Sequence, residues 1–188
     1  MTACILFIFE GDKTEKTITD SLLKFYIKND KRIVFSSFKT DIYALYKMLS
    51  EDEDLDVFAI IKERNPELND YTRDSFSQLF LFFDYDGHSP AANDDKIIEL
   101  LDFFNEETEN GKLFISYPMV ESIKCLSNID AIEEFCNHSV NICDCSGFKK
   151  YISEYAHKSL IHFSLYDLVT WNSIIRVHCV KANFIIKG

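Results

Sequence analysis

The sequence predicts an α/β fold, in which a parallel sheet of about four strands is flanked by helices and followed by a C-terminal helical extension. Three observations support this prediction. Short apolar runs alternate with segments of helical periodicity as far as residue 116, and such alternation is typical of parallel βαβ units with right-handed crossovers. The apolar runs are continuous, as in strands buried on both faces. Beyond Pro118 the periodicity is helical only.

The first half of the pattern contains two strands and three helices. Residues 4–9 form an uninterrupted apolar run that ends at Glu10 and Gly11. Residues 14–29 carry apolar side chains at helical spacing, with Thr14 as the expected N-cap. Residues 32–38 form the second strand, and residues 41–49 and 57–64 are helical. The acidic run 51–54 between these helices is interpreted as a solvated loop.

The third strand covers residues 78–83 and stops at Asp84. A helix is expected over residues 93–109, because its apolar side chains form one stripe and Asn110 and Gly111 provide a stop. Residues 112–116 form the fourth strand. Helices are then expected over residues 119–126, 129–135, 149–157 and 165–184. We therefore expect an α/β core over residues 1–122 and a helical extension over residues 123–188 packed on it.

The composition excludes several classes of protein. The 188 residues are 47% hydrophobic and include 17 Phe and 9 Tyr, which is incompatible with disorder. The net charge of −11 comes without a basic cluster, so a nucleic-acid role requires metal ions or a basic partner. No apolar run reaches the roughly 18 residues of a membrane span, and no signal peptide is apparent. We expect a cytoplasmic chain without a membrane partner, whose six cysteines are free thiols.

Three carboxylates follow two of the buried strands. Glu10 comes directly after the first strand, and Asp84 and Asp86 come after the third. Ligands of open parallel sheets gather at the carboxyl ends of the strands, and oxygen ligands suit a hard cation such as Mg²⁺ or Mn²⁺. An acidic residue can also end a strand simply as a turn former. Three of them after two buried strands favour a metal site.

These segments resemble the Toprim domain that is shared by topoisomerases, primases and nucleases of the OLD-like and RloB-like kind. The first Toprim element is an apolar strand ending in Glu-Gly, as in residues 5–11, and the second is an apolar strand ending in Asp-x-Asp, as in residues 80–86. Residues 9–15 and 115–121 are most similar to the RloB-like and OLD-like branch. The resemblance covers about residues 4–122 and implies a Toprim/Rossmann-like sheet.

The resemblance further implies a nuclease that cleaves phosphodiesters of DNA or RNA with Mg²⁺ or Mn²⁺. Glu10, Asp84 and Asp86 would be metal ligands or the general base, and Glu121 a fourth ligand. It also implies a role in phage defence beside an ATPase partner, and it leaves homo-oligomerisation open. Lys13 is a candidate phosphate contact, although a lysine in a turn is usually solvated.

Several alternatives stay open. His88 is a candidate acid, base or metal ligand, or an exposed turn residue. The same Asp84 to Gly87 segment is similar to the nucleophile motif of haloacid-dehalogenase-like phosphatases, although no later strand ends in the acidic pair that this family needs. A non-catalytic protein-binding module on the same fold is a further alternative. The Cys and His residues of segment 136–145 have a spacing that fits a structural zinc site poorly.

Overall fold

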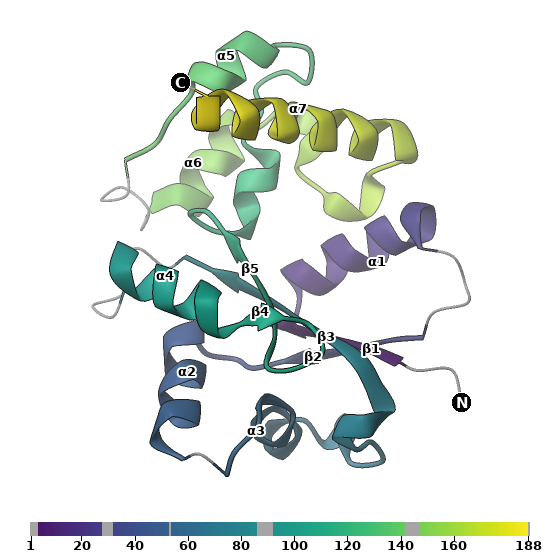
Figure 1. Ribbon diagram of the computed structural model, residues 1–188. Coiled ribbons are helices and arrows are strands. Elements are labelled where there is room, and N and C mark those ends of the chain that lie inside the picture. Colours follow the sequence, from purple (N-terminus) through teal and green to yellow (C-terminus); the bar gives the residue numbers. More distant parts are fainter. Residues whose placement is uncertain (1–3, 28–31, 53, 86–91, 142–146, 188) are drawn as a thin grey trace.

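The computed structural model describes residues 4–27, 32–52, 54–85, 92–141 and 147–187 (Figure 1). Within these residues a sheet of five strands has the order β2-β1-β3-β5-β4. The strands are β1 (Cys4–Phe9), β2 (Ile33–Ser37), β3 (Phe76–Asp84), β4 (Asn105–Glu106) and β5 (Gly111–Ser116). The helices are α1 (Thr14–Tyr26), α2 (Ile42–Glu51), α3 (Val57–Arg64), α4 (Asp94–Phe103), α5 (Ile132–Asn137), α6 (Phe148–Tyr155) and α7 (Leu168–Lys187).

The connections between the strands create a switch point at the centre of the sheet. All pairs among β2, β1, β3 and β5 are parallel. The chain leaves β1 toward β2 on one side, whereas it leaves β3 toward β5 on the other. Figure 1 shows α1 on one face of the sheet and α2 and α3 on the opposite face. In such sheets a crevice opens outside the carboxyl ends of the two strands at the switch, which here are β1 and β3.

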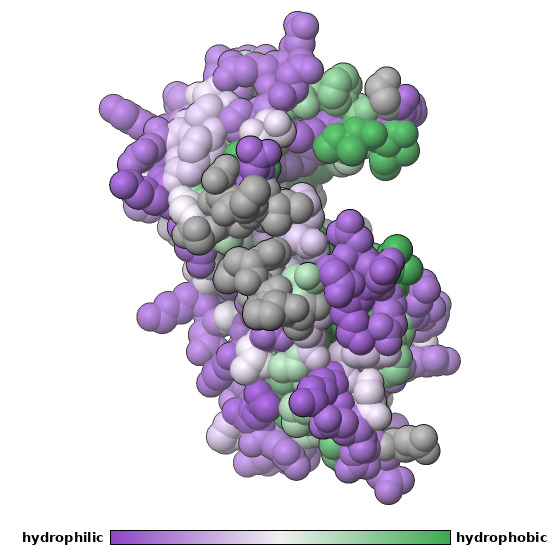
Figure 2. All heavy atoms as spheres, turned by 90° about the vertical axis from the view of Figure 1, so that its left-hand side faces the viewer, coloured by the Kyte–Doolittle hydropathy of each residue, from purple (hydrophilic) through white to green (hydrophobic). Residues whose placement is uncertain are grey.

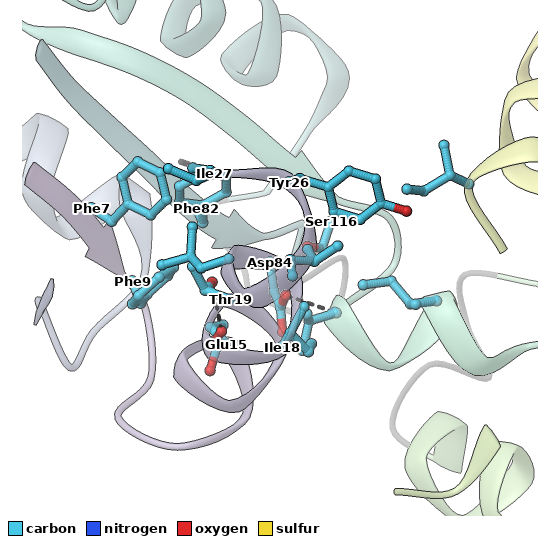
Figure 3. A pocket seen from close by; sticks show the side chains of 15 residues that line it. Phe7, Phe9, Glu15, Ile18, Thr19, Tyr26, Ile27, Phe82, Asp84 and Ser116 are labelled. Atoms are coloured by element: carbon cyan, nitrogen blue, oxygen red, sulfur yellow. Dashed lines mark hydrogen bonds between the residues drawn. The ribbon is translucent and has the colours of Figure 1, made fainter. Parts of the chain in front are cut away.

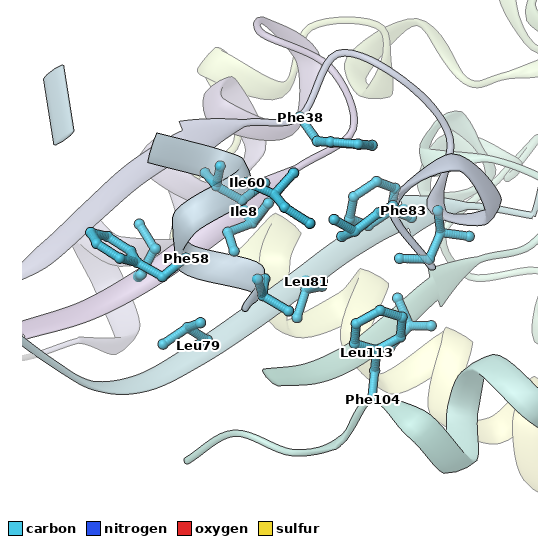
Figure 4. Packing of buried hydrophobic residues seen from close by; sticks show 14 of the residues in the cluster. Ile8, Phe38, Phe58, Ile60, Leu79, Leu81, Phe83, Phe104 and Leu113 are labelled. Carbon is cyan, nitrogen blue, oxygen red and sulfur yellow. The ribbon is translucent and has the colours of Figure 1, made fainter. Parts of the chain in front are cut away.

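One hydrophobic core lies between the sheet and the helices α2 and α3. Alternate strand residues point into it, because side chains of a strand alternate between the two faces. Ile8, Leu81 and Phe83 are at most 1% exposed, and they pack with α3 and with Phe104 (Figure 4). The α/β prediction is therefore confirmed, and the strands β1, β3 and β5 lie where the apolar runs placed them.

A second hydrophobic core joins the helical extension to α1. It contains Ile18 of α1 together with buried residues from Met119 onward. The Trp171 indole N–H donates to Ser21 Oγ at 2.9 Å, so α7 is fastened to the middle of α1. Figure 1 shows α5, α6 and α7 together on the side of the sheet away from α2 and α3, with one end of α7 above α1.

Three local expectations were wrong. The predicted helix over residues 93–109 ends at Phe103, and Asn105–Glu106 pairs antiparallel with Gly111–Lys112 as the edge strand β4. Gly111 has φ +100°, and a Cβ there would lie 2.2 Å from Leu81 Cδ1, so glycine is required for a tight hairpin and not as a helix stop. The sheet accordingly has five described strands instead of about four.

The second error concerns Thr14, which is the first residue of α1 and not its N-cap. Lys13 occupies the N-cap position, and its side chain makes no capping hydrogen bond within the described structure. The third error is the α-helix expected over residues 119–126, where the structure has the short 3-10 helix η3 (Val120–Lys124). No helix among the described residues is long and apolar enough to cross a membrane. The four described cysteines are free thiols.

Candidate functional site

Glu10 and Asp84 are joined at the carboxyl ends of the two strands at the switch point. The backbone N–H of Glu10 donates to the Phe82 carbonyl at 3.1 Å, which continues the ladder between β1 and β3. In the other direction, the Asp84 backbone N–H donates to Glu10 Oε2 at 3.0 Å. Two carboxylates predicted from distant parts of the sequence are thus brought together by the parallel register of their strands.

Asp84 is held in a position that is unfavourable for its charge. Its Oδ1 accepts a hydrogen bond from the Val120 backbone N–H at 2.9 Å, which partly stabilises the carboxylate. Burial has the larger effect and, together with the nearby charges of Glu10, Glu15 and Glu121, it raises the pKa of Asp84 to about 7. At neutral pH this group therefore stands close to its titration midpoint.

Glu121 reaches the same site from η3. Its side chain is only 13% exposed, and Lys149 Nζ lies 3.5 Å from Oε1. The other oxygen, Oε2, is buried without a hydrogen-bond partner among the described residues. A buried carboxylate oxygen of this kind is unfavourable unless a cation or donor reaches it. Glu121 thus lies near Asp84, and its role as a further metal ligand stays a prediction.

Glu15 is a member of the site that the sequence analysis missed. It lies in the first turn of α1, and its charge contributes to the raised pKa of Asp84. A Cβ on Gly11 would lie 3.1 Å from Glu15 Oε2 and 3.3 Å from Oε1, so the bare backbone of Gly11 leaves room for this carboxylate. The available signal was its position: the first turn of a helix that follows the strand directly points back to the strand end.

An open cavity of about 480 Å³ lies in front of these carboxylates. It is lined by Glu10, Asp84 and Glu121, by the turn from Gly11 to Glu15, and by Lys39, Thr40, Val120 and Lys149. Lys13 lines the cavity as expected from the sequence. The cavity therefore combines lysines with carboxylates, and two of the lysines lie within ion-pair distance of its acidic residues, Lys39 of Asp12 and Lys149 of Glu121.

Lys39 lines this cavity, and its backbone has a left-handed conformation. Its φ is 68°, which is uncommon for a residue with a Cβ. Its backbone N–H donates to the Glu10 carbonyl at 2.9 Å, and its ammonium lies 3.9 Å from Asp12 Oδ2. Asp12 also accepts a hydrogen bond from Ser37 Oγ at the end of β2. These contacts fix the turn after β1 against the end of β2, and strain of this kind is common at functional sites.

Other predicted residues lie outside the described part of the chain. These are Asp86 and His88, together with Cys143 and Cys145 of the cysteine-rich segment. His138 stacks on Tyr155 with ring centroids 4.6 Å apart. Over residues 4–27, 32–52, 54–85, 92–141 and 147–187 no group of three or more His, Cys, Asp or Glu residues is arranged to hold a metal ion.

Glu10, Asp84 and Glu121 are the described residues whose oxygens could hold a divalent cation. Glu10 and Asp84 supply carboxylate oxygens at adjacent strand ends, and Glu121 adds a buried oxygen without a partner among the described residues. Such oxygen ligands are those that Mg²⁺ and Mn²⁺ prefer. Positive charge at this position would also offset the repulsion that raises the pKa of Asp84. No family model matches the chain, and no curated protein or solved structure shows significant similarity to it.

Proposed function

We propose that the protein is a divalent-metal-dependent, phosphodiester-cleaving enzyme of the Toprim type that acts on DNA or RNA. The observation that carries the proposal is the pair Glu10 and Asp84. At the switch point of the parallel sheet the Asp84 backbone N–H donates to the Glu10 carboxylate, and burial together with the charges of Glu10 and other carboxylates raises the pKa of Asp84 to about 7. Perturbed carboxylates in a strand-end cavity are typical of catalytic sites.

The cation would be held by Glu10 and Asp84, with Glu121 and Asp86 as further ligands. When bound there, Mg²⁺ or Mn²⁺ supplies positive charge that neutralises the acidic cavity and activates water. The Asp84 carboxylate is fixed for this role by the Val120 N–H and by its own backbone bond to Glu10. Ligands oriented by such outer contacts need little rearrangement on binding.

The lysines of the cavity would bind the phosphate. Lys13 stands at the start of α1, and Lys39 and Lys149 line the cavity on other sides. A phosphate placed between them is attracted by their ammonium groups and lies against the carboxylate cluster. We assign the role of general base toward an attacking water to Glu15, whose charge contributes to the raised pKa of Asp84. The role in phage defence with an ATPase partner is part of this proposal only through the family resemblance.

The test is cleavage of plasmid, single-stranded DNA and RNA by the purified chain, with Mg²⁺ or Mn²⁺ and with EDTA. Glu10→Gln and Asp84→Asn keep the shapes of the side chains and remove their charges. Each is expected to lower the rate at least about 100-fold, because even outer-shell partners of metal sites contribute about 10- to 100-fold. Asp102→Asn is the matched control, since Asp102 is exposed on α4, away from the site.

Metal binding should be measured separately by calorimetric titration of the wild-type chain and the same variants. The proposal requires saturable binding of Mg²⁺ or Mn²⁺ that Asp84→Asn weakens and Asp102→Asn leaves unchanged. A folded wild-type chain that binds neither ion, and that cleaves none of the three substrates, would contradict it.

A non-catalytic protein-binding module is the second candidate, and the surface of α7 favours it. Phe184, Ile185 and Ile186 are 46%, 67% and 82% exposed. Figure 2 shows hydrophobic side chains gathered on the upper part of the molecule, over the helical extension. Exposed apolar patches are typical of protein contacts. Binding of a protein partner that is lost in Ile186→Ser, without any metal-dependent cleavage, would support this candidate.

A further inference from the structure

A second, mostly apolar pocket of about 400 Å³ adjoins the carboxylate cavity. It lies between the sheet, α1, η3 and α7, and Glu15, Asp84 and Val120 line both spaces. Figure 3 shows the rings of Phe7, Phe9 and Phe82 on the sheet side of this pocket, with Asp84 beyond them. Pockets of this size, with apolar walls and a few polar groups at one end, are typical of small-molecule and cofactor sites.

The sheet wall of this pocket continues as a row of aromatic rings across three strands. Phe9 of β1 is paired in register with Phe82 of β3, which is paired with Phe114 of β5. The ring centroids of Phe9 and Phe82 are 5.5 Å apart, and those of Phe82 and Phe114 are 5.3 Å apart with nearly parallel planes. Phe114 is 47% exposed, so the row runs from the buried pocket to solvent.

The strand β3 fixes the distance between the ring of Phe82 and the carboxylate of Asp84. Phe82 and Asp84 are two residues apart on one strand, so their side chains lie on the same face, about 7 Å apart along the strand. An occupant that fills both spaces must have a flat apolar part next to an anionic, cation-binding part. A nucleotide has this construction, with its base on one side and its phosphate on the other.

The acidic charge of the chain limits how a nucleotide could be held. With a net charge of −11 the protein offers few phosphate contacts, and the lysines that line the carboxylate cavity are Lys13, Lys39 and Lys149. Stacking of bases on aromatic side chains contributes to binding without requiring positive charge. A base within a duplex cannot reach a pocket beneath α1, whereas an unpaired base can.

We propose that Phe82 and Phe114, supported by the buried ring of Phe9, form a stacking platform for unpaired bases, and that the substrate is therefore single-stranded nucleic acid. This inference rests on the proposed function, because it assigns the phosphate beside the stacked base to the carboxylate cavity. It predicts that affinity depends on the bases more than on the backbone. For a single strand, each phosphate contact contributes about 0.7 to the slope of log Kd against the logarithm of the salt concentration. With three lysines in the cavity, log Kd should therefore change by no more than about 2 for each tenfold change in salt concentration.

The test is fluorescence anisotropy with the full chain in Ca²⁺, with the integrity of the probe checked afterward. The probes are a short fluorescein-labelled single strand, an abasic strand of the same length and the corresponding duplex. The single strand is expected to bind about tenfold or more tightly than the abasic strand, since stacking on one aromatic residue changes affinity by roughly 5- to 150-fold. Phe82→Leu and Phe114→Leu should each remove most of this difference.

Phe25→Leu is the matched control, because Phe25 lies on α1, is 39% exposed and does not line the pocket. Phe114 is the more exposed member of the row, so its variant stays informative if Phe82→Leu does not fold. Equal affinity for the normal and abasic strands, or preference for the duplex, would overturn the inference. So would a Phe114→Leu variant that changes the oligomeric state in sedimentation without changing oligonucleotide affinity.

The outcomes separate this inference from the proposed function. Metal-dependent cleavage without any effect of the bases on affinity refutes the stacking platform and leaves the enzyme proposal in place. Base-dependent binding that Phe114→Leu weakens, without cleavage of any substrate, supports the platform and refutes the enzyme proposal.

Discussion

Replacing Asp84 by asparagine is expected to stabilise the metal-free protein at neutral pH while it removes metal-dependent activity. Burial and the adjacent carboxylates raise the pKa of Asp84 from 3.8 to about 7. This difference of about 3 pH units corresponds to ~4 kcal/mol, at roughly 1.4 kcal/mol per unit. Asp84 is only partly buried, and solvent screening reduces the effect, so we expect a gain of about 2 to 4 kcal/mol at pH 8.

The sign of the pH dependence follows from which state binds the proton. Between pH 4 and pH 7 the folded chain keeps the Asp84 proton and the unfolded chain has lost it. The stability that this group contributes is therefore fully present below about pH 4, and it is lost as the pH rises through about 7. In Asp84→Asn the amide oxygen can still accept the Val120 N–H, and this loss should disappear.

The assay is denaturant and thermal unfolding in EDTA at several pH values from 4 to 8. For a chain of this length ~3 kcal/mol corresponds to about 6 to 12 °C in Tm at pH 8. Asp102→Asn, on the exposed side of α4, should not change the profile. Added Mg²⁺ should stabilise the wild type and not Asp84→Asn. An Asp84→Asn variant that is less stable than the wild type at pH 8, or equally dependent on pH, would refute the reasoning.

Two further substitutions test the turns beside the site and one tests the hairpin at the other end of β5, and Gly147→Ala, where a Cβ meets nothing within 4 Å, is the control for the two glycine substitutions. Gly11→Ala should displace the Glu15 carboxylate and lower metal-dependent kcat/KM about tenfold, with less than about 1 kcal/mol change in unfolding free energy. Gly111→Ala should destabilise the fold by about 2 to 4 kcal/mol in urea unfolding, because of its φ of +100° and a contact of 2.2 Å to the next strand. Lys39→Gly should relieve the left-handed backbone and raise stability by ~0.5 to 1 kcal/mol, while loss of its charge lowers activity. A stable Gly111→Ala or a destabilised Lys39→Gly would contradict these assignments.

The sequence was sufficient for features that depend on local patterns. Apolar runs identify β1 and most of β3, because central strands of a parallel sheet carry apolar side chains on both faces. Because β1 and β3 are parallel neighbours, Glu10 and Asp84 lie together at the carboxyl ends of these strands. This part of the candidate site could therefore be predicted from residue order alone.

Features that depend on tertiary contacts could not be predicted in this way. The stretch after Phe103 keeps a helical pattern, yet pairing of β4 with β5 and the close approach of Gly111 to Leu81 override it. Glu15 was missed although its position in the first turn of α1 was a signal, because the room for its carboxylate depends on the absence of a side chain at Gly11. The left-handed Lys39 has no sequence signal, since lysine seldom adopts this conformation.

The single tryptophan gives the molecule an internal optical probe. Trp171 is 2% exposed, its indole N–H is bonded to Ser21, and its ring lies 5.0 Å from that of Tyr166. Its emission therefore reports separation of α7 from α1, whereas far-ultraviolet circular dichroism reports the whole secondary structure. If both signals change together during denaturation, the two halves of the chain unfold as one cooperative unit. An earlier red shift of the emission would show that the helical half detaches first, and would define a partly unfolded intermediate.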